Sequence, residues 1–222
     1  VRRVFCSGEA LSADLMNRFF EAFRCELHNL YGPTEAAVDV CGWTCHPDTA
    51  LRTVPIGRPI ANTQLYVLDA NLAPLPIGVA GELHIGGVQV GRGYLNRPEL
   101  TRERFIDNPF GSGRLYKTGD RARYLDDGSL EFLGRLDDQI KIGGFRIEPA
   151  EIEFALLQHP AVREAAVVAR LLPSGHQRLV AYVTRHDQQA DERQLITDLR
   201  ELLRAQLPDL MVPGIIVVLE RL

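Results

Sequence analysis

The sequence predicts a mixed α/β and α+β fold, and three changes of pattern along the chain support this prediction. The first part alternates a strand, a helix and a second strand before a loop. A stretch punctuated by Gly and Pro follows, in which short strands predict antiparallel β-structure. The last part combines strands with amphipathic helices, as a small α+β unit does. We therefore expect two units, residues 1–136 and residues 137–222.

The first part has the pattern of α/β structure. Residues 2–7 are interpreted as a buried strand. Leu15, Phe19 and Phe23 then recur every four positions, which predicts a helix with an apolar face. A short strand over residues 26–30 runs into a loop. Because binding sites in open α/β sheets lie beyond the carboxyl ends of strands, this loop is a candidate position for one.

The middle part predicts a distorted β-barrel portion. Gly and Pro separate short runs with strand character, and Asp126 to Ser129 form a hairpin turn in which Gly128 supplies a positive φ. The expected strands are residues 64–68, 82–85, 115–117, 121–125 and 130–133.

The last part predicts a small α+β unit. Pro149 stands where a first helical turn tolerates it, and Asp191 is placed to cap a strongly amphipathic helix. A turn at residues 173–175 separates two of the strands. The expected strands are residues 139–142, 165–172, 179–184 and 215–219.

Composition and charge exclude several classes of protein. Hydrophobic residues make up 45% of the 222 residues and charged residues 24%, which are ordinary values for a globular chain. The formal net charge is −4 and no basic block occurs, so neither nucleic acid nor a membrane surface is an expected partner. No apolar run approaches the roughly 20 residues that a membrane-spanning helix needs.

All four cysteines lie in the first 45 residues, without the density of a disulfide framework and without a signal-peptide pattern. We therefore expect a reducing, cytoplasmic location. Cys41, Cys45 and His46 could suggest zinc, but a structural zinc site takes four ligands and the sequence has no second pair. Ordinary packing or loop roles are the favoured interpretation.

Three clusters combine residue types that suit a nucleotide, and each also has a plain structural interpretation. Residues 29–35 place an aromatic ring, a hydroxyl and a carboxylate close together, or form an ordinary loop. Asp120 follows Thr-Gly and could hold ribose hydroxyls, or stabilise a turn. Residues 134–148 include Arg135, which suits phosphate or ribose oxygens, or form a charged linker.

Five ordered segments together resemble the adenylation domains of nonribosomal peptide synthetases, which belong to the adenylate-forming superfamily. The segments resemble the family patterns N-x-Y-G-P-T-E, G-E-L-x-I-x-G…R-G-Y-L, Y-[RK]-T-G-D, G-R-x-D-x-Q-[VI]-K-I-R-G-x-R-I-E-x-x-E and L-P-x-Y-M-[VI]-P. They occupy residues 29–35, 81–95, 116–120, 134–151 and 207–213. The fourth segment departs from the pattern at Gly143, where the family has Arg.

The resemblance implies a reaction, its cofactors and its partners. Such domains activate an amino acid with ATP and Mg²⁺ to an aminoacyl-adenylate, and then pass it to the phosphopantetheine thiol of a carrier protein. It implies carrier and condensation domains of the same synthetase as partners, together with a small MbtH-like activator protein. In fold terms it implies the end of a large α/β core, the β-barrel portion and a mobile, incomplete C-terminal subdomain.

The resemblance also assigns roles to individual residues. In the loop after the second strand, which includes Gly32, Tyr31 would stack on adenine, Thr34 would contact phosphate and Glu35 would ligate Mg²⁺. In the later segments, Asp120 would bind the ribose hydroxyls and Arg135 would contact ribose or phosphate oxygens. Asp137 would be the hinge. Thr34, Glu35 and Arg135 are thus the catalytic candidates.

A substrate pocket is expected at five positions, which by spacing are Phe5, Ser7, Leu30, Val38 and Asp39. This set resembles the pocket of members that activate L-serine. The chemistry agrees, because Ser7 and Asp39 could hydrogen-bond a hydroxyl while the apolar members limit its size. The alternative is that Asp39 is a strand-end carboxylate that faces solvent.

The sequence is also compatible with two other functions. The family's phosphate loop and its C-terminal lysine are not found in these 222 residues, and both ends look cut, so we expect the isolated segment to be inactive. An acyl-CoA or aryl-acid ligase of the same superfamily is one alternative. A catalytically silent docking unit is another.

Overall fold

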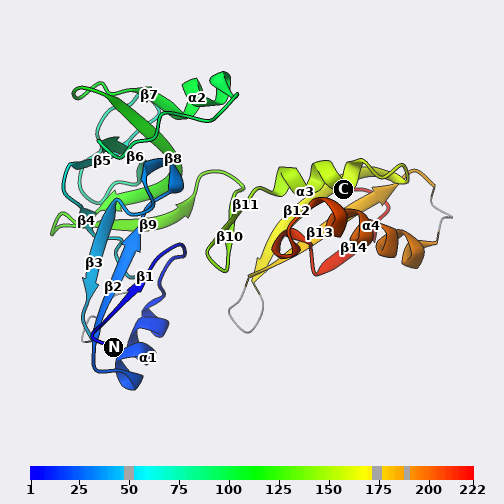
Figure 1. Cartoon of the computed structure of the whole chain (residues 1–222), viewed down its shortest axis with the longest axis horizontal. Helices are drawn as coiled ribbons and strands as arrows, with labels where there is room; N and C mark the ends of the chain where they lie inside the picture. The colour runs from blue at the N-terminus through cyan, green and yellow to red at the C-terminus, as the bar shows by residue number, and fades with distance from the viewer. Residues whose placement is uncertain (48–52, 172–176, 188–190) are drawn as a thin grey trace. The chain divides into compact units, whose positions relative to one another are not determined.

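The chain divides into two compact units, Val1–Asp137 and Asp138–Leu222. The computed structural model describes residues 1–47, 53–171, 177–187 and 191–222 (Figure 1). Both units combine helices with strands, which confirms the predicted mixed fold. The fourth motif segment is divided between them, because Arg135 belongs to the first unit and Gln139 to the second.

The first sheet of the N-terminal unit has four strands in the order β1-β2-β3-β4. Strands β1 and β2 are parallel and joined by helix α1, as the sequence predicts, and the other pairs are antiparallel. The side-chain oxygen of Ser12 caps α1 by accepting a hydrogen bond from the Leu15 amide at 3.1 Å. The elements are β1 (Arg3–Cys6), α1 (Ala13–Ala22), β2 (Glu26–Tyr31), the 3₁₀ helix η1 (Thr34–Ala36), β3 (Cys41–Cys45) and β4 (Arg58–Pro59).

Helix α1 does not bury its predicted apolar stripe. Met16 is its fully buried residue, whereas Leu15 and Phe23 are 53% and 57% exposed. Phe19 packs partly against the small core that Met16 shares with Leu27 of β2. The helix is therefore confirmed, but the residues that face the sheet differ from the periodic stripe.

The second sheet of this unit contains β5, β6, β8 and β7 in that order, with β9 also paired to β8. Its elements are β5 (Thr63–Leu68), β6 (Gly81–Gly87), α2 (Pro98–Arg104), β7 (Phe105–Asp107), β8 (Arg114–Tyr124) and β9 (Leu130–Arg135). Two of the predicted strands are parts of the single strand β8. The sequence interpretation missed α2, although Pro98 at its first turn is a recognised start signal.

The antiparallel pairing in this sheet is confirmed, but the predicted barrel is wrong in the part of the chain that the structure describes. Strand β6 takes one edge of β8, while β7 and β9 share the opposite edge, one along each half. The strands at the two sides of the sheet do not pair with each other, so the sheet stays open. The shift of register between Asp120 and Ala122 marks where the second half of β8 begins.

The C-terminal unit is a three-stranded sheet, in the order β12-β13-β14, that carries two helices. Helix α3 packs on β12 and contacts α4, and a separate hairpin pairs β10 with β11. Asp191 caps α4 as predicted, and α4 buries Leu195, Leu199 and Leu203. The elements are β10 (Ile140–Ile142), β11 (Phe145–Ile147), α3 (Pro149–Leu157), β12 (Val162–Leu171), β13 (Gln177–Arg185), α4 (Glu192–Gln206), η2 (Asp209–Met211) and β14 (Ile215–Leu219). The predicted turn at residues 173–175 lies outside the described residues.

The four cysteines are free thiols. Cys41 and Cys45 stand at opposite ends of β3, about 13 Å apart by the rise of a strand, so they cannot share one metal ion. In the described ranges no group of three or more His, Cys, Asp or Glu side chains is placed to hold a metal. Within the same ranges no helix has the length and apolar character needed to cross a membrane.

Burial makes two of these thiols unreactive. It raises the pKa of Cys41 to about 12, with a further contribution from the charge of Asp39, and it raises the pKa of Cys45 to about 11. We expect both to stay protonated at pH 8 and to react with iodoacetamide only after unfolding. Half-buried Cys25 is the internal control. Mass spectrometry after alkylation of the native protein tests this, and labelling of Cys41 as fast as Cys25 would contradict it.

Candidate functional site

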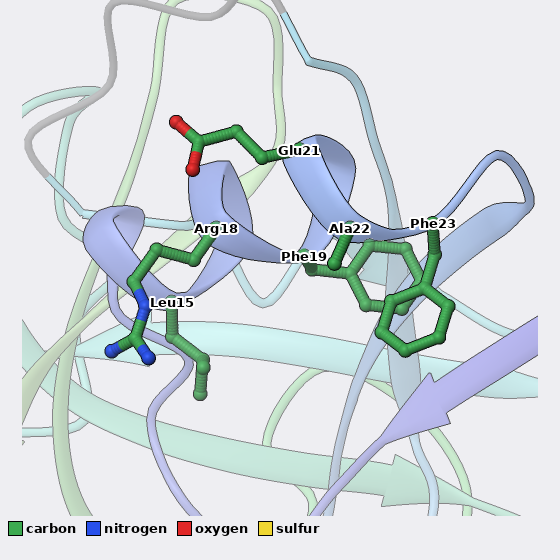
Figure 2. Close-up of a pocket in the computed structure, with 6 residues that line it drawn as sticks. All are labelled: Leu15, Arg18, Phe19, Glu21, Ala22 and Phe23. Carbon is green, nitrogen blue, oxygen red and sulfur yellow. The ribbon is translucent and has the colours of Figure 1, made fainter.

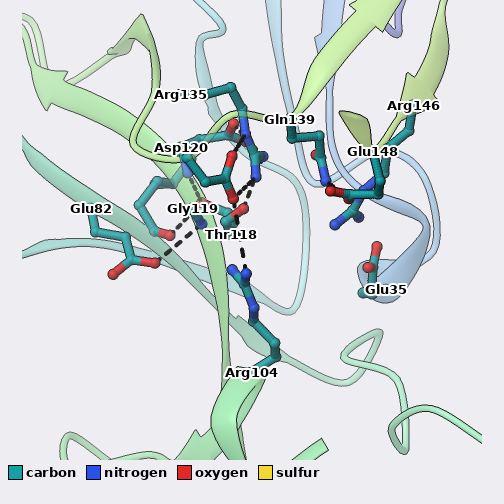
Figure 3. A network of polar contacts seen from close by, with 12 residues as sticks. Glu35, Glu82, Arg104, Thr118, Gly119, Asp120, Arg135, Gln139, Arg146 and Glu148 are labelled. Atoms are coloured by element: carbon teal, nitrogen blue, oxygen red, sulfur yellow. Dashed lines mark hydrogen bonds and ion pairs between the residues drawn. The ribbon is translucent and has the colours of Figure 1, made fainter. Parts of the chain in front are cut away.

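Strands β8 and β9 place Asp120 opposite Arg135. The two residues are paired in register, and Arg135 Nη1 donates to Asp120 Oδ1 at 2.8 Å (Figure 3). Asp120 is only 3% exposed and the Arg135 side chain 12%. A carboxylate this deeply buried needs a paired cation and further hydrogen bonds to hold its charge.

Tyr31, at the end of β2, supplies one of those hydrogen bonds. Its hydroxyl donates to Oδ2 of Asp120, the oxygen that Arg135 leaves open. Burial and then the neighbouring Asp120 charge raise the pKa of Tyr31 well above its usual value, so it remains a donor. The ring is 7% exposed and lies 6.3 Å from the Phe132 ring, centre to centre. Its stacking on adenine stays a prediction.

A bulge in β8 sets the orientation of Asp120. Gly119 has a φ of +71°, and a Cβ there would lie 2.8 Å from Arg135 Nη2 and from Asp137 Oδ2. The Gly119 amide donates to Glu82 Oε1 at 3.1 Å, as Figure 3 shows. The Thr118 hydroxyl accepts from the Asp120 amide at 2.9 Å. Glycine is therefore favoured in this Thr-Gly-Asp segment, chiefly because of the positive φ, and its lack of a side chain lets the arginine pack directly against it.

Arg135 is also tied to Asp137, the predicted hinge residue. Its Nε donates to Asp137 Oδ1 at 2.7 Å and its Nη2 to Oδ2 at 2.6 Å. Nη1 donates a further bond to the Thr118 carbonyl at 2.9 Å. Burial alone would lower the pKa of Arg135, but the charges of Asp137 and Asp120 outweigh it and raise that pKa. The guanidinium is thus permanently charged and held on several sides.

Glu35 is positioned by a different segment. Tyr94 donates its hydroxyl to Glu35 Oε1 at 2.7 Å, and the Gly91 amide donates to the Glu35 carbonyl at 2.7 Å. Thr34, the first residue of η1, is exposed. A side chain at Gly32 would collide with the Val38 carbonyl, so this turn needs glycine. The sequence interpretation gave Tyr94 no role, although it lies in one of the motif segments.

Four of the five predicted pocket residues, Phe5, Ser7, Leu30 and Asp39, lie on or beside one face of the first sheet, and Val38 lies in the turn that precedes Asp39. Ser7 donates its hydroxyl to Asp39 Oδ1 at 3.1 Å, although 32 residues separate them. Phe5 and Leu30 alternate onto the same face as Ser7, and both Phe5 and Val38 are more than half exposed.

The sequence interpretation missed one residue of this face. The His28 ring stacks on Phe5 at a centroid distance of 5.0 Å. Its hydrogen-bond neighbours are Thr44 and Glu26, each at 3.2 Å. A histidine that alternates with Leu30 along a strand was the available signal.

A separate hollow of about 530 Å³ lies on α1 and contains none of the predicted site residues (Figure 2). It is lined by Leu15, Arg18, Phe19, Glu21, Ala22 and Phe23.

Two family models match the chain. Residues 1–95 match the AMP-binding enzyme model, and residues 151–222 match the AMP-binding enzyme C-terminal domain. Among curated proteins, phosphinothricin tripeptide synthetase PhsB from Streptomyces viridochromogenes is 52% identical to this chain. The match covers the whole of this chain and 19% of the length of PhsB. Tyrocidine synthase 3 from Brevibacillus parabrevis is 48% identical to the whole of this chain, over 3% of its own length. The chain thus spans a small part of these relatives.

Solved structures agree with this similarity. The adenylation domain AlmE of Vibrio cholerae, in complex with glycyl-adenosine-5′-phosphate, matches all of this chain over 42% of its own length, with a TM-score of 0.88 and 32% identity. An artificially fused adenylation–PCP di-domain, NpsA-ThdA from Klebsiella oxytoca, matches 96% of this chain over 39% of its own, with a TM-score of 0.83 and 32% identity.

The buried pair gives a stability prediction. Arg135→Gln leaves the Asp120 charge without its cation, so we expect a loss of about 3–5 kcal/mol in the unfolding free energy of the N-terminal unit. Adding Asp120→Asn removes that charge and should recover part of the loss.

Urea unfolding of the purified variants measures both effects. The control is Arg3→Gln, because the Arg3–Glu26 pair has side chains 63% and 53% exposed and contributes little. Equal stability of Arg135→Gln and Arg3→Gln would show that the buried pair is not needed.

Proposed function

Because the chain belongs to the AMP-binding enzyme family, we propose that the protein carrying it is an ATP-dependent amino-acid ligase of nonribosomal peptide synthesis. It would activate an amino acid, L-serine by the pocket residues, as an aminoacyl-adenylate. The observation that carries the proposal is the buried Tyr31–Asp120–Arg135 network, together with the Ser7–Asp39 pair on the neighbouring sheet.

The nucleotide role follows from the chemistry of the side chains. A carboxylate can accept both ribose hydroxyls at once, and the Asp120 carboxylate is held by Tyr31 and Arg135 while Thr118 accepts from its backbone amide. Arg135 offers a planar fork for ribose or phosphate oxygens. Fixing these groups in advance favours the attack of a carboxylate on the α-phosphate, which depends mainly on charge and position.

Magnesium fits the residues of the loop after β2. Mg²⁺ prefers oxygen ligands and is commonly held by one or two carboxylates together with substrate phosphates. Glu35 provides a carboxylate oriented by Tyr94, and Thr34 provides an exposed hydroxyl beside it for a phosphate oxygen. The bound ion would neutralise phosphate charge as pyrophosphate leaves.

The pocket residues support a small hydroxylated substrate. The Ser7–Asp39 bond shows that two polar groups meet on a face that also carries Phe5 and Leu30. A site that hydrogen-bonds a hydroxyl discriminates against analogues that lack it, because the Asp39 carboxylate then has no substrate donor beside the Ser7 hydroxyl. Serine is thus preferred over alanine.

Transfer to a carrier protein completes the proposed function. The solved relatives include proteins that contain both adenylation and PCP domains. The partners would be phosphopantetheine-bearing carrier and condensation domains of one synthetase and an MbtH-like activator. Asp137, the last residue of the first unit, would act as the hinge between adenylation and transfer.

The substrate proposal predicts a specific loss of activity. Asp39→Ala should lower kcat/KM for serine in ATP–pyrophosphate exchange by about 10- to 100-fold, because a charged hydrogen-bond acceptor is removed. Asp14→Ala, at an exposed α1 carboxylate, is the matched control and should behave as wild type. Exchange that depends on a hydrophobic amino acid and not on serine would refute the assignment.

A further inference from the structure

We propose that Asp137 occupies the place of a nucleotide oxyanion at Arg135, and that Arg104 is the positioning residue that receives Asp137 when nucleotide binds. The inference rests on the proposed function, since it concerns the same arginine. It adds Arg104, at the end of α2, to the residues on which nucleotide binding depends.

The guanidinium of Arg135 is already hydrogen-bonded to protein oxygens. A guanidinium has five N–H donors, and Asp137, Asp120 and the Thr118 carbonyl together accept bonds from four of them. Asp137 forms a bidentate contact with the edge of the guanidinium that carries Nε and Nη2. This edge also has the geometry for bidentate binding of a phosphate or a carboxylate. A nucleotide oxyanion therefore cannot make a two-pronged contact there until Asp137 moves.

A second cation, Arg104, lies close to Asp137. Arg104 Nη2 lies 3.9 Å from Asp137 Oδ2, the oxygen that accepts from Arg135 Nη2. Arg104 is 27% exposed and abuts the β8 bulge, where a Cβ at Gly119 would lie 3.4 Å from its Nη1. Its other described ion pair, 3.6 Å to Glu103, involves a side chain that is 65% exposed.

The charges around Arg135 balance. Asp120 and Asp137 carry two negative charges, and Arg135 and Arg104 carry two positive charges. When an oxyanion takes the Arg135 edge, Asp137, whose side chain is 33% exposed, loses both of its bonds to that guanidinium. Closing the 3.9 Å gap to Arg104 gives the displaced carboxylate a paired cation again. Nucleotide binding is thereby coupled to the last residue of the N-terminal unit.

A double-mutant cycle tests this coupling in the protein that carries the chain, with Mg·ATP affinity measured by calorimetry. We expect Arg104→Gln to weaken binding about five-fold, Arg104→Lys to restore most of the affinity, and Asp137→Asn to tighten binding, because it removes the competitor. In the Asp137→Asn background, Arg104→Gln should have almost no effect. Arg102→Gln, exposed on the same turn of α2, is the matched control and should bind as wild type.

Each outcome decides the matter. An equal effect of Arg104→Gln in both backgrounds would show a merely structural role and overturn the inference, as would no effect in either. Wild-type protein that fails to bind Mg·ATP would refute the proposed function and the inference with it. Thermal unfolding without nucleotide identifies a variant that is misfolded, and Arg104→Met, which also removes the charge but keeps an unbranched side chain, then takes the place of Arg104→Gln in the cycle.

Discussion

The buried charge of Asp120 is the constraint on which the N-terminal unit depends. A carboxylate that is 3% exposed has to be neutralised and hydrogen-bonded within the protein. Two other strands meet that demand, because Tyr31 of β2 donates to one carboxylate oxygen and Arg135 of β9 to the other, while the Thr118 hydroxyl accepts from the Asp120 backbone amide. The same bonds fix the register of β8 against β9 and connect the two sheets of the unit.

The side chains that stabilise this charge are also those to which the proposed function gives nucleotide contacts. Tyr31 and Arg135, which hold the Asp120 carboxylate, are the residues that the family resemblance assigns to adenine and to ribose or phosphate oxygens, so stability and the proposed binding depend on the same side chains. Arg135 shows the consequence most clearly, because its guanidinium is engaged with protein oxygens before any ligand arrives. If Arg135 binds the nucleotide as proposed, the affinity depends on what happens to its protein partner Asp137.

The sequence predicted local features well and long-range geometry poorly. The Asp191 cap and the α4 stripe were predictable because they depend on neighbours within one or two turns. The open sheet was not, because closure depends on which strands share an edge of β8. The motifs indicated Asp120 and Arg135 one at a time, but their pairing follows from strand register. Arg104 escaped notice because nothing in its local sequence shows that the fold brings it to Asp137.

The central claim is that Asp120 holds the ribose of an adenine nucleotide, and the affinities for ATP and 2′,3′-dideoxy-ATP test it most directly. Calorimetry measures both affinities for the wild-type protein, in which the acceptor is charged, and for Asp120→Asn, in which it is neutral. The ratio of the two affinities gives the contribution of the ribose hydroxyls in each protein. The account predicts that wild type loses about tenfold or more in affinity without the hydroxyls and that the variant loses much less. Equal losses in both proteins would contradict the claim.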